Sequence, residues 1–220
     1  MDLSNLRQHD LLELIKSYDM YIQDANNKDL FSMGWRPVCI EEYYHNDFQE
    51  EAKRDYITIG DKLVVTDPCY CLDALYQVTI ENMEPGRYEC FLDTINANLG
   101  IYNSCIMLFH ENYDPSRYYP GELESNLIAV DSGQAGFFDY NYYEEHRGTE
   151  EIENNEPSGI FYDKCCDITI YHKDRAGIFD DKCFVSSSGF GDGFYRLYSS
   201  KNKFGKVIAL RLEFIKASDY

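Results

Sequence analysis

Three short segments of the chain combine aspartate with proline, serine or glycine in a way that would suit a binding site. The segments are VVTDPCY (64–70), VDSGQAG (130–136) and SGFGDGFYRLY (188–198), and their aspartates are Asp67, Asp131 and Asp192. Three carboxylates that meet at one rim, together with loop carbonyl groups, would suit a divalent cation such as Ca²⁺ or Mg²⁺. The simpler interpretation is turn chemistry, in which aspartate accepts hydrogen bonds from nearby backbone N–H groups and glycine supplies positive φ angles.

Other chemistry is weakly indicated. Cys69-x-Cys71 and the adjacent Cys165-Cys166 lack the C-x2-C spacing of structural zinc sites. The motifs G-x-S-x-G and H-E-x-x-H do not occur in the sequence. We therefore predict no catalytic residue and favour a protein that is not an enzyme. The eight cysteines are expected to be free and mostly buried thiols, because no secretory signal precedes them.

The same three segments carry a resemblance. TDPCY, VDSGQAGFFD and SGFGDGFYRLY, followed by KVIALRLEF, are similar to motifs of an uncharacterised family of bacterial and phage proteins, a domain of unknown function. The resemblance covers roughly residues 57–215. The chain departs from the family's pattern at Phe190, Phe194 and Arg196, where the family has Tyr, Ser and Pro. The resemblance implies a mostly β domain without an established activity, and it transfers no catalytic residues.

The elements that must position these segments are strands. From Tyr56 onward apolar residues alternate with polar ones, and turn signals such as Pro85-Gly86 and Ser132-Gly133 separate short runs. The pattern predicts strands at 57–59, 62–66, 75–80, 87–93, 104–110, 126–130, 135–139, 160–171, 183–186, 194–198 and 207–215. Many short strands at close spacing predict an antiparallel sandwich or barrel.

The first 54 residues have a different periodicity. Apolar residues recur at helical spacing in 1–24, and again in 39–54, where Ile40, Tyr43, Tyr44 and Phe48 share one side. We therefore expect an N-terminal helical segment, 1–54, that is separable from a β-rich domain, 55–220. The predicted fold is mainly β with an N-terminal helical extension, α+β overall.

The net negative charge of the chain argues against some classes of binding partner. Twenty Lys and Arg stand against 39 Asp and Glu, a net charge of −19. Such a surface repels phosphate backbones and anionic lipids, which argues against direct nucleic-acid binding and membrane docking. No apolar run is long enough for a membrane span, and the N-terminus does not have the pattern of a secretory signal. The expected location is cytoplasmic, in a bacterial cell or a phage-infected host.

Two acidic regions are the candidate partner-binding surfaces. One is the helix side with Glu41, Glu42, Asp47, Glu50 and Glu51, and the other is a loop, 144–156, with Glu150, Glu151, Glu153 and Glu156. With 20 tyrosines available for contact, they favour an acidic inhibitor of a phage or mobile element. It would block a basic effector, such as a nuclease or CRISPR effector, by imitating nucleic acid. Two alternatives stay open: a metal- or small-ligand-binding domain, sequestering or hydrolytic, at Asp67, Asp131 and Asp192, and a structural β-domain. Only the first of these implies a cofactor, a divalent cation.

Overall fold

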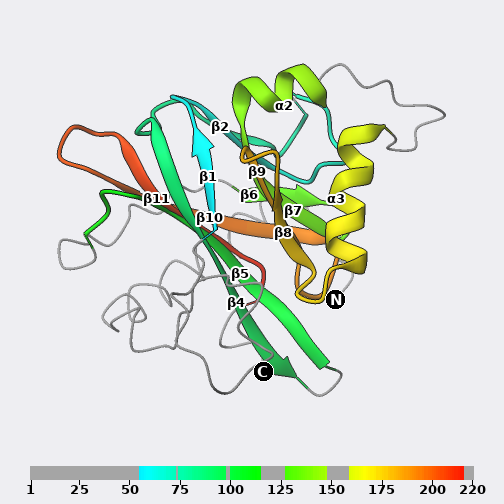
Figure 1. Cartoon of the computed structure of the whole chain (residues 1–220). Helices are drawn as coiled ribbons and strands as arrows, with labels where there is room; N and C mark the ends of the chain where they lie inside the picture. Colours follow the sequence, from blue (N-terminus) through cyan, green and yellow to red (C-terminus); the bar gives the residue numbers. More distant parts are fainter. Residues whose placement is uncertain (1–54, 73, 98–99, 115–126, 148–158, 216–220) are drawn as a thin grey trace, which may run out of the picture. The chain divides into compact units, whose positions relative to one another are not determined.

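Two antiparallel sheets form the part of the chain that the computed structural model describes, namely residues 55–72, 74–97, 100–114, 127–147 and 159–215 (Figure 1). The predicted N-terminal helices, the boundary at residue 54, the acidic helix side 41–51 and Glu150–Glu156 lie outside these residues. The six-stranded sheet has the order β1 (Tyr56–Ile59), β4 (Gly86–Ala97), β5 (Gly100–His110), β11 (Val207–Glu213), β10 (Gly193–Lys201), β6 (Leu127–Val130). The five-stranded sheet has the order β3 (Val78–Ile80), β2 (Leu63–Thr66), β7 (Gln134–Asp139), β9 (Cys183–Ser187), β8 (Ala176–Phe179).

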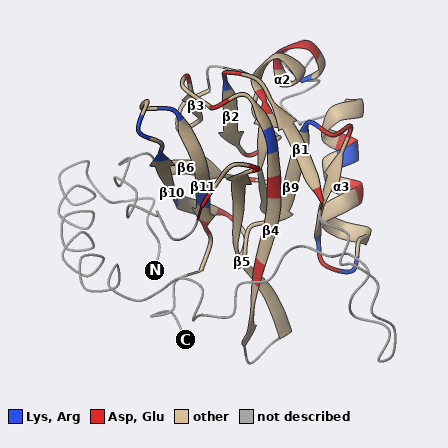
Figure 2. Ribbon diagram, turned by 60° about the vertical axis from the view of Figure 1, so that its left-hand side comes forward, with Lys and Arg blue, Asp and Glu red and all other residues tan. Residues whose placement is uncertain are grey.

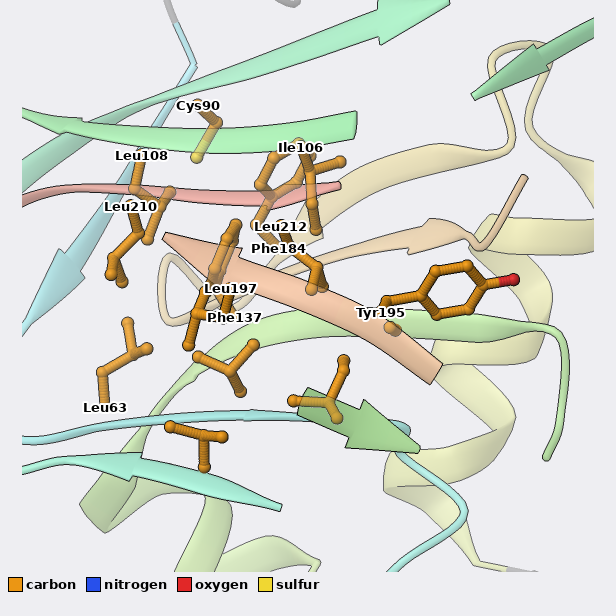
Figure 3. Packing of buried hydrophobic residues seen from close by; sticks show 14 of the residues in the cluster. Leu63, Cys90, Ile106, Leu108, Phe137, Phe184, Tyr195, Leu197, Leu210 and Leu212 are labelled. Carbon is orange, nitrogen blue, oxygen red and sulfur yellow. The ribbon is translucent and has the colours of Figure 1, made fainter. Parts of the chain in front are cut away.

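The main core lies between the two sheets. Leu108 and Leu210 from the six-stranded sheet join Leu63, Phe137 and Phe184 from the five-stranded sheet in one buried cluster (Figure 3). Because successive residues of a strand point to opposite sides, their neighbours along the chain must be buried elsewhere.

A second cluster buries the other side of the five-stranded sheet. Val64, Phe138 and Val185 pack there against Tyr143 and Phe161, which belong to two helices. These are α2 (Tyr140–His146) and α3 (Ile160–Tyr171). Every residue of β2 and β7 is therefore buried, as expected for strands that are covered on both faces. The described residues form three layers: the six-stranded sheet, the five-stranded sheet, and the two helices.

The prediction of a strand at 160–171 is wrong. Its β-branched and aromatic residues favour a strand by propensity, yet the segment is the helix α3. Phe161, Cys165, Ile168 and Thr169 are its buried residues, at the spacing of one helix face. Burying that face against the five-stranded sheet outweighs the weak intrinsic preference for a strand.

The predicted acidic loop 144–156 is wrong at its start, because α2 extends to His146. Asp139 begins this helix by accepting a hydrogen bond from the Tyr142 backbone N–H at 3.2 Å, the usual role of an N-cap aspartate. Residues 148–156 lie outside the described part of the chain.

The predicted fold class is confirmed. The strands pair antiparallel, the two sheets stack as a sandwich without closing into a barrel, and the helices make the class α+β. Among the described residues, seven cysteines are free. No helix in the same residues is long and apolar enough to cross a membrane.

Candidate functional site

The Asp67 side chain joins two of the three motif segments. It directly follows β2 and is fully buried. Its Oδ1 accepts hydrogen bonds from the Cys69 N–H at 2.8 Å and from the Ser132 hydroxyl at 2.5 Å. Its Oδ2 accepts from the backbone N–H groups of Asp131 at 2.8 Å and Ser132 at 2.7 Å. One buried carboxylate therefore satisfies four donors and fixes the loop after β2 to the loop before β7.

Helix α2 holds the same loop from the other side. Arg147, at the C-terminus of α2, is fully buried. Its Nε donates to the Pro68 carbonyl oxygen and its Nη2 to the Cys69 carbonyl oxygen, each at 2.8 Å. Tyr143 donates its hydroxyl to the Tyr70 carbonyl oxygen at 2.5 Å. The carbonyl groups of residues 68–70, which lie beyond the end of β2 and have no strand partner there, thus accept hydrogen bonds from these side chains.

The third segment meets the second. Gly193 pairs with Val130 where β10 lies beside β6, and the Ser188 N–H donates to the Gly133 carbonyl oxygen at 3.0 Å. The Tyr195 hydroxyl lies 2.9 Å from the Ser188 carbonyl oxygen, which fixes the glycine-rich turn to its own strand. Residues 67–70, 131–134 and 188–194 thus form one edge of the sandwich, here called the motif rim.

The Cys69 thiol at the motif rim does not have the character of a nucleophile. Burial, and then the nearby Asp67 carboxylate, raise the pKa of the Cys69 thiol above its ordinary value. The thiol therefore stays protonated at neutral pH, whereas a reactive cysteine needs a lowered pKa. The Tyr70 hydroxyl donates to Asp131 Oδ2 at 2.5 Å, and burial followed by this bond raises its pKa as well.

Helix α3 contacts the motif rim through polar side chains. Thr169 donates its hydroxyl to Gln134 Oε1 at 3.0 Å, and Gln134 Nε2 donates to the Cys166 sulfur at 3.4 Å. Burial raises the pKa of Tyr162, whose hydroxyl lies within hydrogen-bonding reach of Ser132 and Cys166. These polar groups bond mainly to one another, so they hold the segments in place.

The outer side of the rim presents aromatic rings and carboxylates. Phe194 is 43% exposed and contacts the 57% exposed Tyr76 ring edge-to-face, with 5.2 Å between centroids. Phe190 is 60% exposed and packs on Tyr102 in the same way at 5.0 Å. Tyr76 has a φ of +63°, a left-handed conformation that is uncommon for a residue with a side chain.

The three predicted carboxylates all lie at the motif rim, but they differ in burial and in hydrogen bonding. Asp131 and Asp192 are exposed, and they flank the pairing of Val130 with Gly193. Asp67 is buried, and both of its oxygens already accept two hydrogen bonds. Within the described part of the chain, no group of three His, Cys, Asp or Glu side chains could hold a metal ion. Turn chemistry accounts for Asp67, and the cation site at this trio stays a prediction.

Sequence reasoning missed Tyr76, Tyr143 and Arg147. The arginine stands within the acidic run EEHRGTEE, so its charge gave no sign of a buried role. The available signal was the N-cap pattern of Asp139 before an aromatic-rich stretch, with Tyr143 and Arg147 four residues apart on one helix face.

Comparisons with known proteins give a family and no further relative. No curated protein and no solved structure matches the chain. Residues 59–212 match the family described as "Protein of unknown function (DUF4241)", in agreement with the expected membership of an uncharacterised family. The match covers more than half of the 220 residues, and the chain therefore belongs to the DUF4241 family.

Proposed function

We propose that the protein is an acidic, non-enzymatic binding protein that attaches to a basic partner protein through the motif rim. The observation that carries the proposal is the combination of exposed Phe190, Phe194 and Asp192 on a turn whose backbone is fixed by Ser188 and Tyr195. Aromatic rings held in place lose little conformational freedom on binding, which favours them as contact residues.

The charge supports a basic partner. With a net charge of −19, the chain attracts cationic surfaces over a distance of roughly one Debye length, about 8 Å at physiological ionic strength. Figure 2 shows acidic residues on both helices and on β4, so the negative charge is spread over the domain. Arginine or lysine of a partner would meet both carboxylates and ring faces at the rim, and cations bind favourably to both.

The finer proposal is inhibition of a nucleic-acid-binding effector, as an inhibitor carried by a phage or mobile element would achieve. Carboxylates would take the places of phosphates, and aromatic rings the places of bases. Duplex or single-stranded DNA should then compete with the protein for the partner. Binding that is indifferent to added DNA would contradict this mimicry but leave the binding rim itself untouched.

The test compares three full-length proteins in capture experiments from a bacterial lysate, at low and at high salt. The rim variant is Phe190→Ala with Phe194→Ala, and the control is Phe204→Ala, a ring in the β10–β11 loop that is more exposed than either rim ring. We expect the rim variant to lose at least about tenfold in affinity for the captured basic protein, since central aromatic contacts dominate interfaces. Equal binding by both variants, or binding that salt does not weaken, would overturn the proposal.

The two acidic regions predicted from sequence add a second comparison. Reversing Glu41, Glu42, Glu50 and Glu51 to Lys should weaken binding more than reversing Glu150, Glu151, Glu153 and Glu156. The reason is that the sequence predicts a helix for the first set and a loop for the second, and a loop loses more entropy when it binds. Titration of the captured partner with both variants measures the difference.

A further inference from the structure

The outward side of the six-stranded sheet has buried apolar residues at its centre, with charged residues among their neighbours. Leu108 and Ile106 of β5 point into the core between the sheets, so Met107 and Cys105 point the other way. The strand register places Met107 and Cys105 beside outward-pointing residues of the neighbouring strands β4 and β11. The resulting outer face contains Phe91, Cys105, Met107, Phe109, Tyr198 and Ala209 together with the polar residues Glu89, Asp93, Arg196, Ser200, Arg211 and Glu213.

The centre of this outer face is buried. Met107 is 1% exposed and Cys105 is 5% exposed. Yet both described helices contact strands of the other sheet, α2 against β2 and β7 and α3 against β8 and β9. An antiparallel sheet with one side in water carries polar side chains on that side. An apolar and buried centre without a described layer above it indicates a face that another part of the molecule covers.

We propose that residues 39–54 pack as a helix on the outer face and complete a four-layered domain. Residue 54 adjoins the six-stranded sheet, since Asp55 precedes the edge strand β1 and its carbonyl oxygen accepts a hydrogen bond from the Cys90 N–H at 3.0 Å. The segment is thereby tied to the border of the six-stranded sheet. Its apolar residues Ile40, Tyr43, Tyr44 and Phe48 share one side at helical spacing and need a surface to cover them.

The dimensions agree. Sixteen helical residues extend about 24 Å at roughly 1.5 Å each. Six strands leave five gaps of about 4.8 Å, which also make about 24 Å. A helix over 39–54 is therefore long enough to cross the whole sheet. Packing in this way buries the side with Ile40 and Tyr44, on which Asp47 and Glu51 also lie, and leaves Glu42 on the opposite side. This packing is independent of the proposed function. It would assign residues 39–54 to the β-rich domain, whereas the separable segment 1–54 expected from sequence stays a prediction.

Two native cysteines report on the outer face in the full-length protein. Cys105 lies on the outer face, and Cys90 lies on the core side of the adjacent strand β4. The test variant is Tyr44→Asp with Phe48→Asp. The control is Asn46→Asp with Gln49→Asp, which adds the same charge to the opposite side of the expected helix. The measurement is the rate of thiol alkylation under native conditions, followed by peptide mass mapping.

We expect the test variant to raise the alkylation rate of Cys105 at least about tenfold, with Cys90 protected and the control variant unchanged. A Cys105 rate that is the same in all three proteins would overturn the proposal. Equal acceleration of Cys105 and Cys90 would also count against it, because the variant would then act by opening the whole sandwich.

Cross-linking gives a second measurement that does not depend on the stability of the charged variants. A short bis-maleimide should join Tyr44→Cys to Cys105 within one chain and should fail with Gln49→Cys. Cross-links that appear only between chains, and that increase with protein concentration, would assign the outer face to a second copy instead. Links from Gln49→Cys as frequent as those from Tyr44→Cys would contradict the orientation of the helix.

Discussion

Asp67 and Asp192 have the same appearance in the sequence and opposite roles in the molecule. Each stands beside Pro or Gly next to a strand. Asp67 follows β2, which is covered on both faces, and its carboxylate is buried among four hydrogen-bond donors. Asp192 precedes β10 and is exposed. Whether an aspartate at a strand end stabilises the fold or faces solvent therefore depends on whether the strand is covered on both faces.

This contrast indicates that one half of the motif rim stabilises the fold, and it leaves the other half for the recognition that we propose. The Asp67 side satisfies backbone groups that would otherwise be buried without partners, which is costly. The glycine-rich turn instead presents Phe190, Asp192 and Phe194 to solvent. Variants on the two sides should therefore separate in a stability measurement, and the following predictions are ordered by the size of that effect.

Asp67→Asn should have the largest effect. Both carboxylate oxygens accept hydrogen bonds from N–H or O–H donors, so either orientation of the amide would place its NH₂ group against donors of Cys69, Asp131 or Ser132. We expect a loss of about 3 kcal/mol or more in the free energy of unfolding, as is usual when a buried network is broken. Urea denaturation followed by circular dichroism measures it. A loss below about 1 kcal/mol would show that Asp67 is not the anchor of the rim.

Gly189→Ala should follow, with Gly133→Ala as its matched control. Both glycines have a left-handed φ, +61° and +69°. A Cβ at Gly189 would lie 2.7 Å from Ile215 Cγ1, whereas a Cβ at Gly133 would meet nothing within 4 Å. Both variants should lose about 1 kcal/mol through the backbone, and Gly189→Ala should lose a further 1–3 kcal/mol, roughly, through crowding. Equal midpoints in thermal unfolding would mean that Ile215 moves aside without cost.

The sequence predicted every described strand except β8 (Ala176–Phe179), because β propensity and turn signals are local properties. It failed at 160–171, where β-branched residues favour a strand and only the five-stranded sheet makes Phe161, Cys165 and Ile168 a helix face. The three motif segments do lie beside one another, but a shared ligand site at their aspartates stays a prediction.

Turn chemistry predicted the local bond from the Cys69 N–H to Asp67, but the long-range contacts at the motif rim were not predictable. Asp67 bonds to backbone groups more than 60 residues away along the chain, and nothing local distinguishes it from Asp192. Arg147 stands among glutamates, which predict a solvated loop, although its guanidinium is buried against two carbonyl oxygens. Long-range hydrogen bonds of this kind follow from the packing of layers, which periodicity alone does not specify.

Tyr143→Phe should have a moderate, pH-dependent effect. The ring packs among Phe138 and Phe161, and its hydroxyl donates to the Tyr70 carbonyl oxygen. Losing that bond should cost about 1 kcal/mol near neutral pH. Burial raises the pKa of Tyr143, so its contribution is complete below the unfolded pKa of about 10 and is lost as pH rises further. The difference between wild type and variant, measured by urea denaturation, should therefore narrow above about pH 10. A difference that widens there would contradict the burial of this hydroxyl.

Asp192→Asn should have the smallest effect on stability and thereby test the comparison most directly. Its side chain is exposed, and surface substitutions usually change the free energy of unfolding by less than about 0.5 kcal/mol. The amide keeps the size of the side chain and removes only the charge.

If the outer side of the motif rim meets a basic partner, the Asp192→Asn variant should bind that partner more weakly at low salt. The difference in affinity from wild type should shrink as added salt screens the lost attraction. Urea denaturation and titration of the captured partner, carried out on the same preparations, measure both quantities. Destabilisation comparable to that of Asp67→Asn would place Asp192 among the structural residues, because the loss of an exposed charge cannot account for several kcal/mol. The glycine-rich turn would then belong with the structural residues, and recognition would fall to Phe190, Phe194 and the acidic regions 41–51 and 150–156, which lie outside the described residues.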